Sequence, residues 1–517
     1  MASTFHSIET AKRGVMTQTT ALSTTGHNVA NANTEGYSRQ RVNMQASIPM
    51  EPLAFLRSTA PGQLGTGVEF SSITRVREKF LDDQYRNENT SLGNWTVQKD
   101  TLEKLEAIVN EPSDTGLRTV MDNFFNAWSD LSKNPEDVTA RTVLKERTIA
   151  LTDSMNQISR QLNALSQDLN TNINIKAQEV QGYLTNIANL NDSITKIESL
   201  GDNANDLRDQ RDLLTDKLSK IINITVTDTA QGYQIQMNGQ NLVTGNAVGT
   251  AVDGAFLTGA FQGGTLTDGE VYGMIRSKDV LVRDYQRQMD ELANTLANGD
   301  MEITIPAGSI LPDNTVLNDV TYTGTARTLT ADLKVTVKGL NGLHQLGYGL
   351  DGTTAAGLPF FTASGGAATI TAGNISMNAA IQADPKKIAA SLRTTTSSDK
   401  EDVVAGNNTL ANLMANIKNT PIKSIDGLRN APIGAQFSAI VGQLGVQSQE
   451  AARQAANQEV LVQQVETRRQ SVSGVSLDEE MSNMIKFQHA YTASARFMTT
   501  FDELLDKLIN STGVVGR

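Results

Sequence analysis

Four histidines are the residues best suited to bind a metal or to transfer a proton near neutral pH, and they stand far apart. They are His6, His27, His344 and His489. No two of them occupy the spacing that places two imidazoles on one helix face, so the sequence predicts no zinc site. We interpret each as a structural or solvent-exposed side chain. The sequence contains no cysteine, which excludes disulfides, thiolate ligands and thiol nucleophiles.

Two segments match ligand-binding loops only in part. Residues 347–352 read GYGLDG, which has the GxGxxG spacing of a pyrophosphate-binding loop. The flanking segments NGLHQL and GTTAAGLPFF predict neither the strand nor the helix that such a loop needs, so we expect a turn-rich loop. The run at 202–206 begins like a calcium loop, but Leu213 stands where the bidentate glutamate belongs. A polar helix N-cap is the better interpretation of that run.

Paired acidic residues are the remaining candidates for chemistry. Asp82-Asp83 and Glu479-Glu480 lie in predicted helices that are rich in opposite charge, where we expect solvated faces and i,i+4 ion pairs. Neither a phosphate-binding GxxxxGK[ST] motif nor a GxSxG nucleophile motif occurs. The sequence therefore predicts no catalytic residue, no cofactor site and no metal site, and we expect a protein that is not an enzyme.

The charge and hydropathy of the chain limit the kinds of molecule that it is expected to bind. The 44 basic and 56 acidic residues give a formal net charge of −12, which opposes binding to nucleic acid or anionic lipid. We expect no nucleic-acid partner and no membrane insertion, since no apolar run approaches the length of a membrane span. The first residues lack a continuous apolar core, so a cleaved signal peptide is not predicted.

Amphipathic helices are expected at both ends of the chain. Near the N-terminus apolar residues recur every seven positions, at Ile8, Val15, Leu22 and Val29. Near the C-terminus they alternate steps of four and three, at Leu477, Met481, Met484, Tyr491, Met498, Phe501, Leu505 and Leu508. Such spacing is typical of a coiled-coil seam, so we predict that these residues form an assembly interface. The alternative is a C-terminal helix that packs on its own domain.

The middle of the chain mixes long helices with strands. Apolar positions from Leu151 to Ile197 keep one helical spacing and predict a helix of about 50 residues, and shorter helices are expected near 117–131 and 281–296. Alternating residues around 233–237 lead into Asn238-Gly239, which predicts a hairpin turn. We expect a mainly α fold with inserted β: an elongated, discontinuous, coiled-coil-like helical bundle whose N- and C-terminal helices lie together.

Three domains follow from this pattern. Residues 1–50 plus 471–517 are expected to form a terminal coiled-coil assembly domain that is disordered in the monomer. Residues 51–222, 273–299 and 405–470 are expected to form a helical rod domain. Residues 223–272 plus 300–404 are expected to form one or more inserted β-rich outer domains.

Several segments carry a family resemblance. Residues 27–42, HNVANANTEGYSRQRV, resemble the N-terminal signature of the axial proteins of bacterial flagella, although Glu35 stands where many relatives have Pro. Four more segments closely resemble the hook-associated protein 1 family of these axial proteins. They are FFNAWSDLSKNPEDVTAR (124–141), NDLRDQRDLLTDKLSKI (205–221), GYGLDG (347–352) and SLDEEMSNMIKFQHAYTASARFMTT (476–500). Residues 300–340 are not covered by the resemblance.

The resemblance implies a structural subunit of the bacterial flagellum at the extracellular junction between hook and filament. It implies self-association in a ring, contacts with the hook protein and with a second junction protein (hook-associated protein 3), and no catalytic role. It also implies secretion through the flagellar type III apparatus without a cleaved signal peptide, with a cytoplasmic export chaperone at the C-terminal helix. The alternatives are another axial protein, hook protein or flagellin-like, and an adhesin or hydrolase module displayed by the inserted strands.

Overall fold

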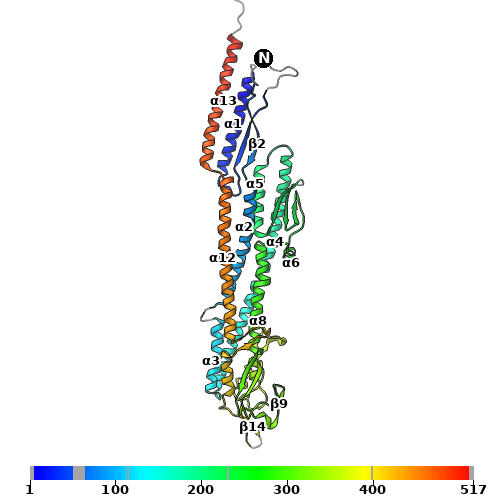
Figure 1. Cartoon of the computed structure of the whole chain (residues 1–517), viewed down its shortest axis with the longest axis vertical. Helices are drawn as coiled ribbons and strands as arrows, with labels where there is room; N and C mark the ends of the chain where they lie inside the picture. The colour runs from blue at the N-terminus through cyan, green and yellow to red at the C-terminus, as the bar shows by residue number, and fades with distance from the viewer. Residues whose placement is uncertain are drawn as a thin grey trace, which may run out of the picture. The chain divides into compact units, whose positions relative to one another are not determined.

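The structure is a computed structural model that describes residues 5–49, 64–111, 113, 116–229, 232–397 and 400–511 (Figure 1). The chain forms two compact units. The first comprises Met1–Asn94, Asn174–Tyr272 and Ala455–Arg517, and the second comprises Trp95–Ile173 and Gly273–Gln454. Three long helices have residues in both units: α2 (Lys79–Val109), α4 (Val138–Glu198) and α12 (Ile433–Ser473).

The first unit combines helices with two small antiparallel sheets. Strands β1 and β2 form a hairpin-like pair whose register shifts between Asn43 and Met44, and β3, β4, β5 and β6 form a four-stranded meander. Besides parts of α2, α4 and α12, its elements are α1 (His6–Ala30), β1 (Gln40–Ala46), β2 (Val68–Arg75), α5 (Asn205–Ile221), β3 (Thr225–Thr229), β4 (Gly232–Met237), β5 (Gln240–Thr244), β6 (Ala247–Val248), α6 (Gly254–Gln262) and α13 (Leu477–Ser511).

The second unit contains a four-stranded sheet in the order β10-β7-β15-β16 and three two-stranded ones. Helix α7 (Glu270–Arg276) leads into it and continues as a π-helical turn, η1 (Ser277–Val282). Its other elements are α3 (Leu117–Lys133), α8 (Arg283–Asn298), β7 (Asp300–Ile305), β8 (Thr315–Leu317), β9 (Val320–Tyr322), β10 (Leu333–Lys338), α9 (Gly339–His344), β11 (Phe361–Ala363), β12 (Ile375–Met377), α10 (Ala379–Ala383), β13 (Thr394–Ser397), β14 (Lys400–Val403), α11 (Thr409–Asn416), β15 (Ile422–Lys423) and β16 (Asn430–Ala431).

An aromatic cluster lies in the core of the second unit. Trp128 and Phe124 on α3 are fully buried, with ring centroids 5.4 Å from Phe360 and 6.2 Å from Phe361, respectively. Phe360 and Phe361 meet edge to face. This arrangement explains the apolar face of 117–131, because the side chains that repeat along α3 all enter one core.

The predicted mainly α fold with inserted β is confirmed. The stripe that begins at Leu151 is buried along α4, and Ile197 is its exposed end. The hairpin turn at Asn238-Gly239 is also confirmed, since both residues have the positive φ that this turn needs. The GYGLDG segment forms the predicted turn-rich loop.

The predicted polar cap at 202–206 is wrong. Helix α5 does begin there, but its N-cap is Ala204, and no side chain caps the helix. The three-domain division stays a prediction. The structure places its β-rich residues 223–272 in the first unit, whereas 300–404 lie in the second.

Candidate assembly interface

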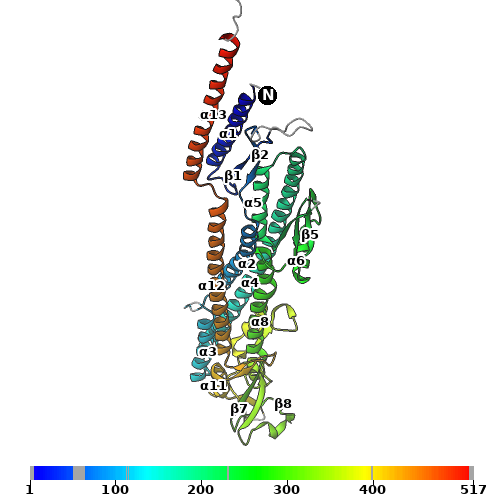
Figure 2. The same ribbon diagram turned by 45° about the horizontal axis from the view of Figure 1, so that its top comes forward.

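The two terminal helices pair in antiparallel fashion within the first unit. Figures 1 and 2 both show α1 and α13 side by side, and Asn28 near the end of α1 bonds to Glu480 near the start of α13. Further along, a Cβ on Gly14 would lie only 2.9 Å from Ser494 Oγ. Only a very small residue therefore fits at position 14.

Small residues form the buried face of α1. They are Ala11, Gly14, Thr17, Ala21, Thr24, Thr25 and Asn28. The four predicted interface residues of α1, Ile8, Val15, Leu22 and Val29, are half-buried and lie beside that face. The closest packing of α1 therefore depends on small side chains, which let two helix backbones approach each other. The proposed role of the four larger residues in assembly stays a prediction.

The predicted residues of α13 fall into two groups. Met484, Met498, Phe501 and Leu505 are half-buried. Leu477, Met481, Tyr491 and Leu508 keep 39–59% of their surface exposed. Ile485, Phe497, Leu504 and Ile509 are exposed as well, so the described part of α13 presents many apolar side chains that this chain leaves uncovered.

A buried asparagine joins the terminal helices to β1. Asn28 is 1% exposed, and its amide nitrogen donates to Gln40 O at 2.9 Å and to Glu480 Oε2 at 3.1 Å. Its carbonyl oxygen accepts from Gln40 N at 3.0 Å and from the Tyr37 hydroxyl at 2.8 Å. Burial raises the pKa of Tyr37, and the nearby Asp206, Asp209 and Glu480 raise it further, so its hydroxyl stays a donor.

Arg39 fixes the connection between α12 and α13. Its guanidinium lies 2.6 Å from Glu479 and 2.9 Å from Glu480, and its backbone N–H donates to Ser473 O at 2.8 Å. The start of β1 is thereby attached both to the end of α12 and to the first turn of α13. The solvated face predicted for Glu479-Glu480 is wrong for Glu480, because this residue is only 2% exposed.

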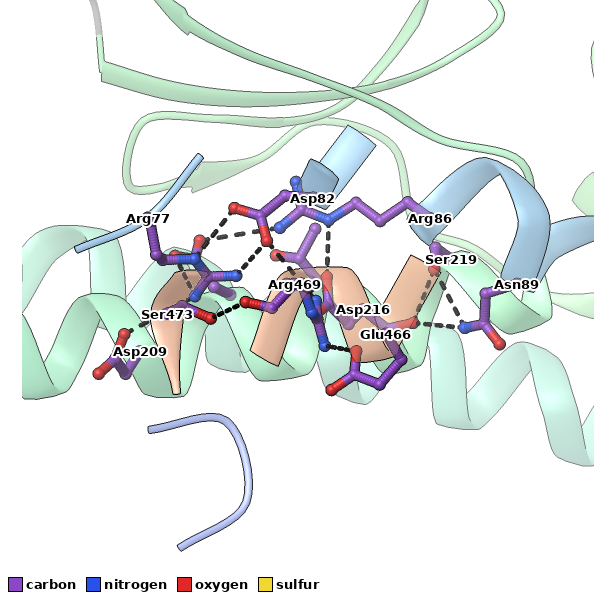
Figure 3. Close-up of polar contacts among 12 residues, drawn as sticks. Arg77, Asp82, Arg86, Asn89, Asp209, Asp216, Ser219, Glu466, Arg469 and Ser473 are labelled. Carbon is purple, nitrogen blue, oxygen red and sulfur yellow. Dashed lines mark hydrogen bonds and ion pairs between the residues drawn. The ribbon is translucent and has the colours of Figure 1, made fainter. Parts of the chain in front are cut away.

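A cluster of alternating charges links α2, α5 and α12 (Figure 3). Arg77 lies 2.7 Å from Asp82, Arg86 lies 2.7 Å from Asp216, and Arg469 on α12 also pairs with Asp216. These five side chains are at most 14% exposed. Asp82 is thus buried, and its predicted place on a solvated face is wrong.

The same cluster extends to two further aspartates of α5. Arg75 contacts Asp209 at 2.7 Å and Asp212 at 2.8 Å. Burial raises the pKa of Asp212, but the charges of Arg77, Arg75 and Arg86 outweigh burial and hold this pKa below its usual value. At Asp209 burial outweighs the neighbouring Arg75, and the pKa is raised.

The ion pairs of this charge cluster have a structural role. Each of its aspartates lies beside an arginine that keeps its proton at any physiological pH, so these ion pairs do not form a proton-transfer pair. Removing one partner would leave a buried charge uncompensated, which makes such pairs sensitive to mutation. The cluster therefore holds three helices of the first unit in register.

The residues that make these connections were not predicted from the sequence. Asn28, Tyr37, Arg39 and Gln40 all lie in the segment 27–42, whose family resemblance assigns no contact to any of these four residues. The acidic stripe of α5 was visible as Asp206, Asp209, Asp212 and Asp216, whose steps of three and four place them on one helix face. A polar face repeated in that way could have indicated a buried ionic contact.

The part of the chain that the structure describes offers neither a metal site nor a membrane span. Among these residues, no group of three or more His, Asp or Glu side chains is arranged to hold a metal ion. No helix in the described ranges is long and apolar enough to cross a membrane.

Three family models match the chain. The flagellar basal body rod protein model matches residues 8–37, and the C-terminal model of the flagellar basal body rod FlgEFG proteins matches 468–511. The model of the flagellar hook-associated protein FlgK helical domain matches 102–299. Together with the paired terminal helices, these matches define the class of the protein as a flagellar structural protein.

Relatives match along the whole sequence. Flagellar hook-associated protein 1 of Bacillus subtilis (strain 168) is 34% identical over 100% of both chains. The protein of the same name from Escherichia coli (strain K12) is 26% identical over 97% of this chain and 99% of that one. The chain belongs to the flagellar hook-associated protein 1 family.

A solved structure has a similar fold. The flagellar hook junction protein FlgK from Burkholderia pseudomallei aligns with a TM-score of 0.50 at 16% identity. The alignment covers 76% of this chain and 100% of that one.

Proposed function

We propose that this chain is a structural subunit of the junction between the flagellar hook and the filament. The observation that carries the proposal is the apolar surface of α13, where Met481 is 59% and Ile485 54% exposed although α1 covers another face of the helix. Exposed apolar surface of this extent indicates an interface with other chains. The Bacillus relative is named a hook-associated protein and the Burkholderia protein a hook junction protein, and both names support the choice of the hook junction.

The proposed mechanism is assembly through the terminal helices. Subunits associate in a ring, in contact with the hook protein on one side and with hook-associated protein 3 on the other. The predicted interface residues of α1 and α13 become buried between neighbouring subunits. In the free monomer both ends are disordered, because each thin amphipathic segment gains too little from burial to offset its ordering entropy. Limited proteolysis of the purified monomer should then trim both ends first, and protected ends would contradict this mechanism.

The proposal includes the route to the cell exterior. The chain leaves through the flagellar type III apparatus with its N-terminal segment uncleaved. A cytoplasmic chaperone covers the exposed apolar face of α13 until export, which keeps this face from aggregating.

A null strain tests the proposed place in the flagellum. Loss of the protein should leave hooks without filaments while flagellin escapes into the medium, and the wild-type gene should restore filaments. The double variant M481K/I485K should not restore them, because it charges the apolar surface of α13. The control is Leu428→Lys in the second unit, where an 81% exposed side chain tolerates the change. Filaments on the null strain would refute the proposal.

Another axial protein, hook protein or flagellin-like, is the second candidate. The rod-protein models at 8–37 and 468–511 favour it, because they match both terminal segments. The helical-domain match at 102–299 favours the junction protein instead. The same null strain separates the two candidates, since loss of hook protein removes the hook itself and loss of flagellin leaves the hook without exported flagellin.

A further inference from the structure

A small groove lies between β1 and the paired terminal helices. We call it the β1 groove, and its cavity has a volume of about 320 Å³. Its apolar or uncharged lining comes from α1 (Ala21, Thr24, Thr25), β1 (Val42, Met44) and α13 (Phe487), and its polar lining includes Arg39, Gln40, Arg41, Glu480, Asn483 and Lys486. A space of this size accepts a few side chains and not a whole helix.

The charges of the β1 groove are not balanced within the chain. Arg39 is paired with Glu479 and Glu480. Arg41 and Lys486 are exposed, and neither forms an ion pair with any residue in the described ranges. An uncompensated positive rim on a chain of net charge −12 attracts an acidic partner.

The last turns of α13 carry apolar and acidic side chains, which are complementary to the lining of the β1 groove. The pairing of Asn28 with Glu480 and of Gly14 with Ser494 places His6 opposite Asp502, so α13 continues past the start of α1 (Figure 1). Along this extension Leu505, Leu508 and Ile509 continue the face that packs on α1. Leu508 is 54% and Ile509 70% exposed.

Acidic residues border that apolar face. Asp502 and Asp506 are both exposed and lie one turn apart on the same side of α13. With Glu503 and Lys507 beside them, the end of α13 combines apolar side chains with a net negative charge. The β1 groove combines an apolar lining with two cations that form no ion pair among the described residues.

We propose that the end of α13 of one copy docks into the β1 groove of a second copy. Ile509 and Leu508 enter the groove, and Asp502 and Asp506 face Arg41 and Lys486. The inference rests on the proposed self-association and adds to it the two surfaces that meet. Because these surfaces differ and lie at opposite ends of the α1–α13 pair, the contact is head to tail, and it closes a ring or continues as a helix according to the rotation between copies.

Cysteine trapping tests the contact directly, because the natural sequence has no cysteine. Full-length Lys486→Cys and Ile509→Cys proteins are mixed at concentrations where the wild type sediments as oligomers, and are then oxidised. The expected product is a disulfide-linked dimer of the two variants. The control mixture pairs Ile509→Cys with Lys196→Cys, a 74% exposed position on α4, and should give no such dimer. Equal trapping in both mixtures would overturn the proposal.

Charge reversal gives a second and independent readout. R41E/K486E should weaken self-association at least tenfold in sedimentation velocity, and so should D502K/D506K. An equimolar mixture of the two should associate again, because each reversed groove then meets a reversed helix end. The control K196E/K334E makes the same change in net charge at exposed positions and should associate like the wild type.

The outcomes separate this inference from the proposed function. Wild-type oligomers with unaffected R41E/K486E would overturn the groove contact and leave assembly through the terminal helices standing. A wild-type chain that stays monomeric at every concentration would overturn both.

Discussion

The side chain of Asn28 connects α1 to three other parts of the first unit. It makes four hydrogen bonds to three residues that belong to β1, to the turn before it and to α13. An amide suits this position because it offers donors on one atom and an acceptor on the other, and all its partners are polar groups that are shielded from water. The joint of the terminal helices is therefore specified by hydrogen bonds as much as by apolar packing.

The first prediction concerns this residue. In the assembled protein, where the proposed mechanism orders the terminal helices, Asn28→Ala should lower the free energy of unfolding of the first unit by about 2–3 kcal/mol, because the backbone N–H of Gln40 and other buried groups lose their partners. Urea unfolding followed by circular dichroism measures the loss. Asn31→Ala is the matched control, since within the described ranges the Asn31 side chain bonds only to His27 and Thr34 nearby, and its effect should be small. Equal losses in both variants would contradict the role given to Asn28.

His344 is the residue that should make stability depend on pH. Burial, helped by the charge of the nearby Arg141, lowers its pKa from 6.5 to about 4. One ring nitrogen lies 2.6 Å from Leu358 O, and the other accepts from the Ala389 N–H at 2.8 Å. A protonated ring could not accept that bond, so the folded chain holds the neutral form.

The second prediction follows from the sign of this shift. Between pH 6.5 and about 4 the unfolded chain binds a proton at His344 that the folded chain does not, so stability falls as pH falls through this range. The loss should approach about 3 kcal/mol. Urea unfolding at pH 7 and pH 4.5 should show a smaller difference for His344→Gln than for the wild type. His489→Gln, at an exposed position on α13, should keep the wild-type difference.

At the scale of elements, a close approach between α2 and α5 depends on a glycine. A Cβ on Gly93 would lie 2.3 Å from the backbone oxygen of Lys220. Neither backbone can move away freely, because the charge cluster formed by Arg86 and Asp216 lies close by on the same two helices.

The third prediction compares two helical glycines of the first unit. Gly93→Ala should destabilise this unit by about 2 kcal/mol or more, since the added methyl group overpacks the contact. Gly182→Ala on α4 should stabilise it by up to about 1 kcal/mol, because nothing lies within 4 Å of the added Cβ and alanine favours helix. Thermal unfolding of both variants measures the difference, and equal shifts would contradict the close approach.

For the whole molecule, the division into two units has a spectroscopic consequence. The sequence contains two tryptophans, Trp95 and Trp128, and both belong to the second unit. Their fluorescence therefore reports the unfolding of that unit, whereas circular dichroism reports the helices of both.

The fourth prediction uses this difference. Asp212→Asn removes one charge from the buried cluster of the first unit and should cost about 3–5 kcal/mol there. The circular dichroism transition should shift to lower urea concentration, while the tryptophan transition shifts less. Asp202→Asn, at an exposed position in the loop before α5, should leave both transitions in place. Transitions that move together would show that the two units unfold as one.

The sequence by itself determined the features that depend on neighbours along the chain. The repeat from Leu151 along α4, the helix near 117–131 and the turn at Asn238-Gly239 all follow from local periodicity or backbone preference. The segment 27–42 and the segments shared with relatives also determined the family. Such signals can be detected in a single sequence because each one lies within a continuous segment of the chain.

Only the tertiary structure decided which faces are buried. The buried face of α1 contains Gly14 and Ala21 instead of Val15 and Leu22, and at Gly14 the side chain of Ser494 on α13 lies too close for a larger residue. Asp82 and Glu480 are buried beside arginines that neutralise them, and two of these, Arg469 and Arg39, come from distant parts of the sequence. Ion pairs and close contacts form between segments that are hundreds of residues apart in the sequence. A local sequence pattern contains no information about such contacts.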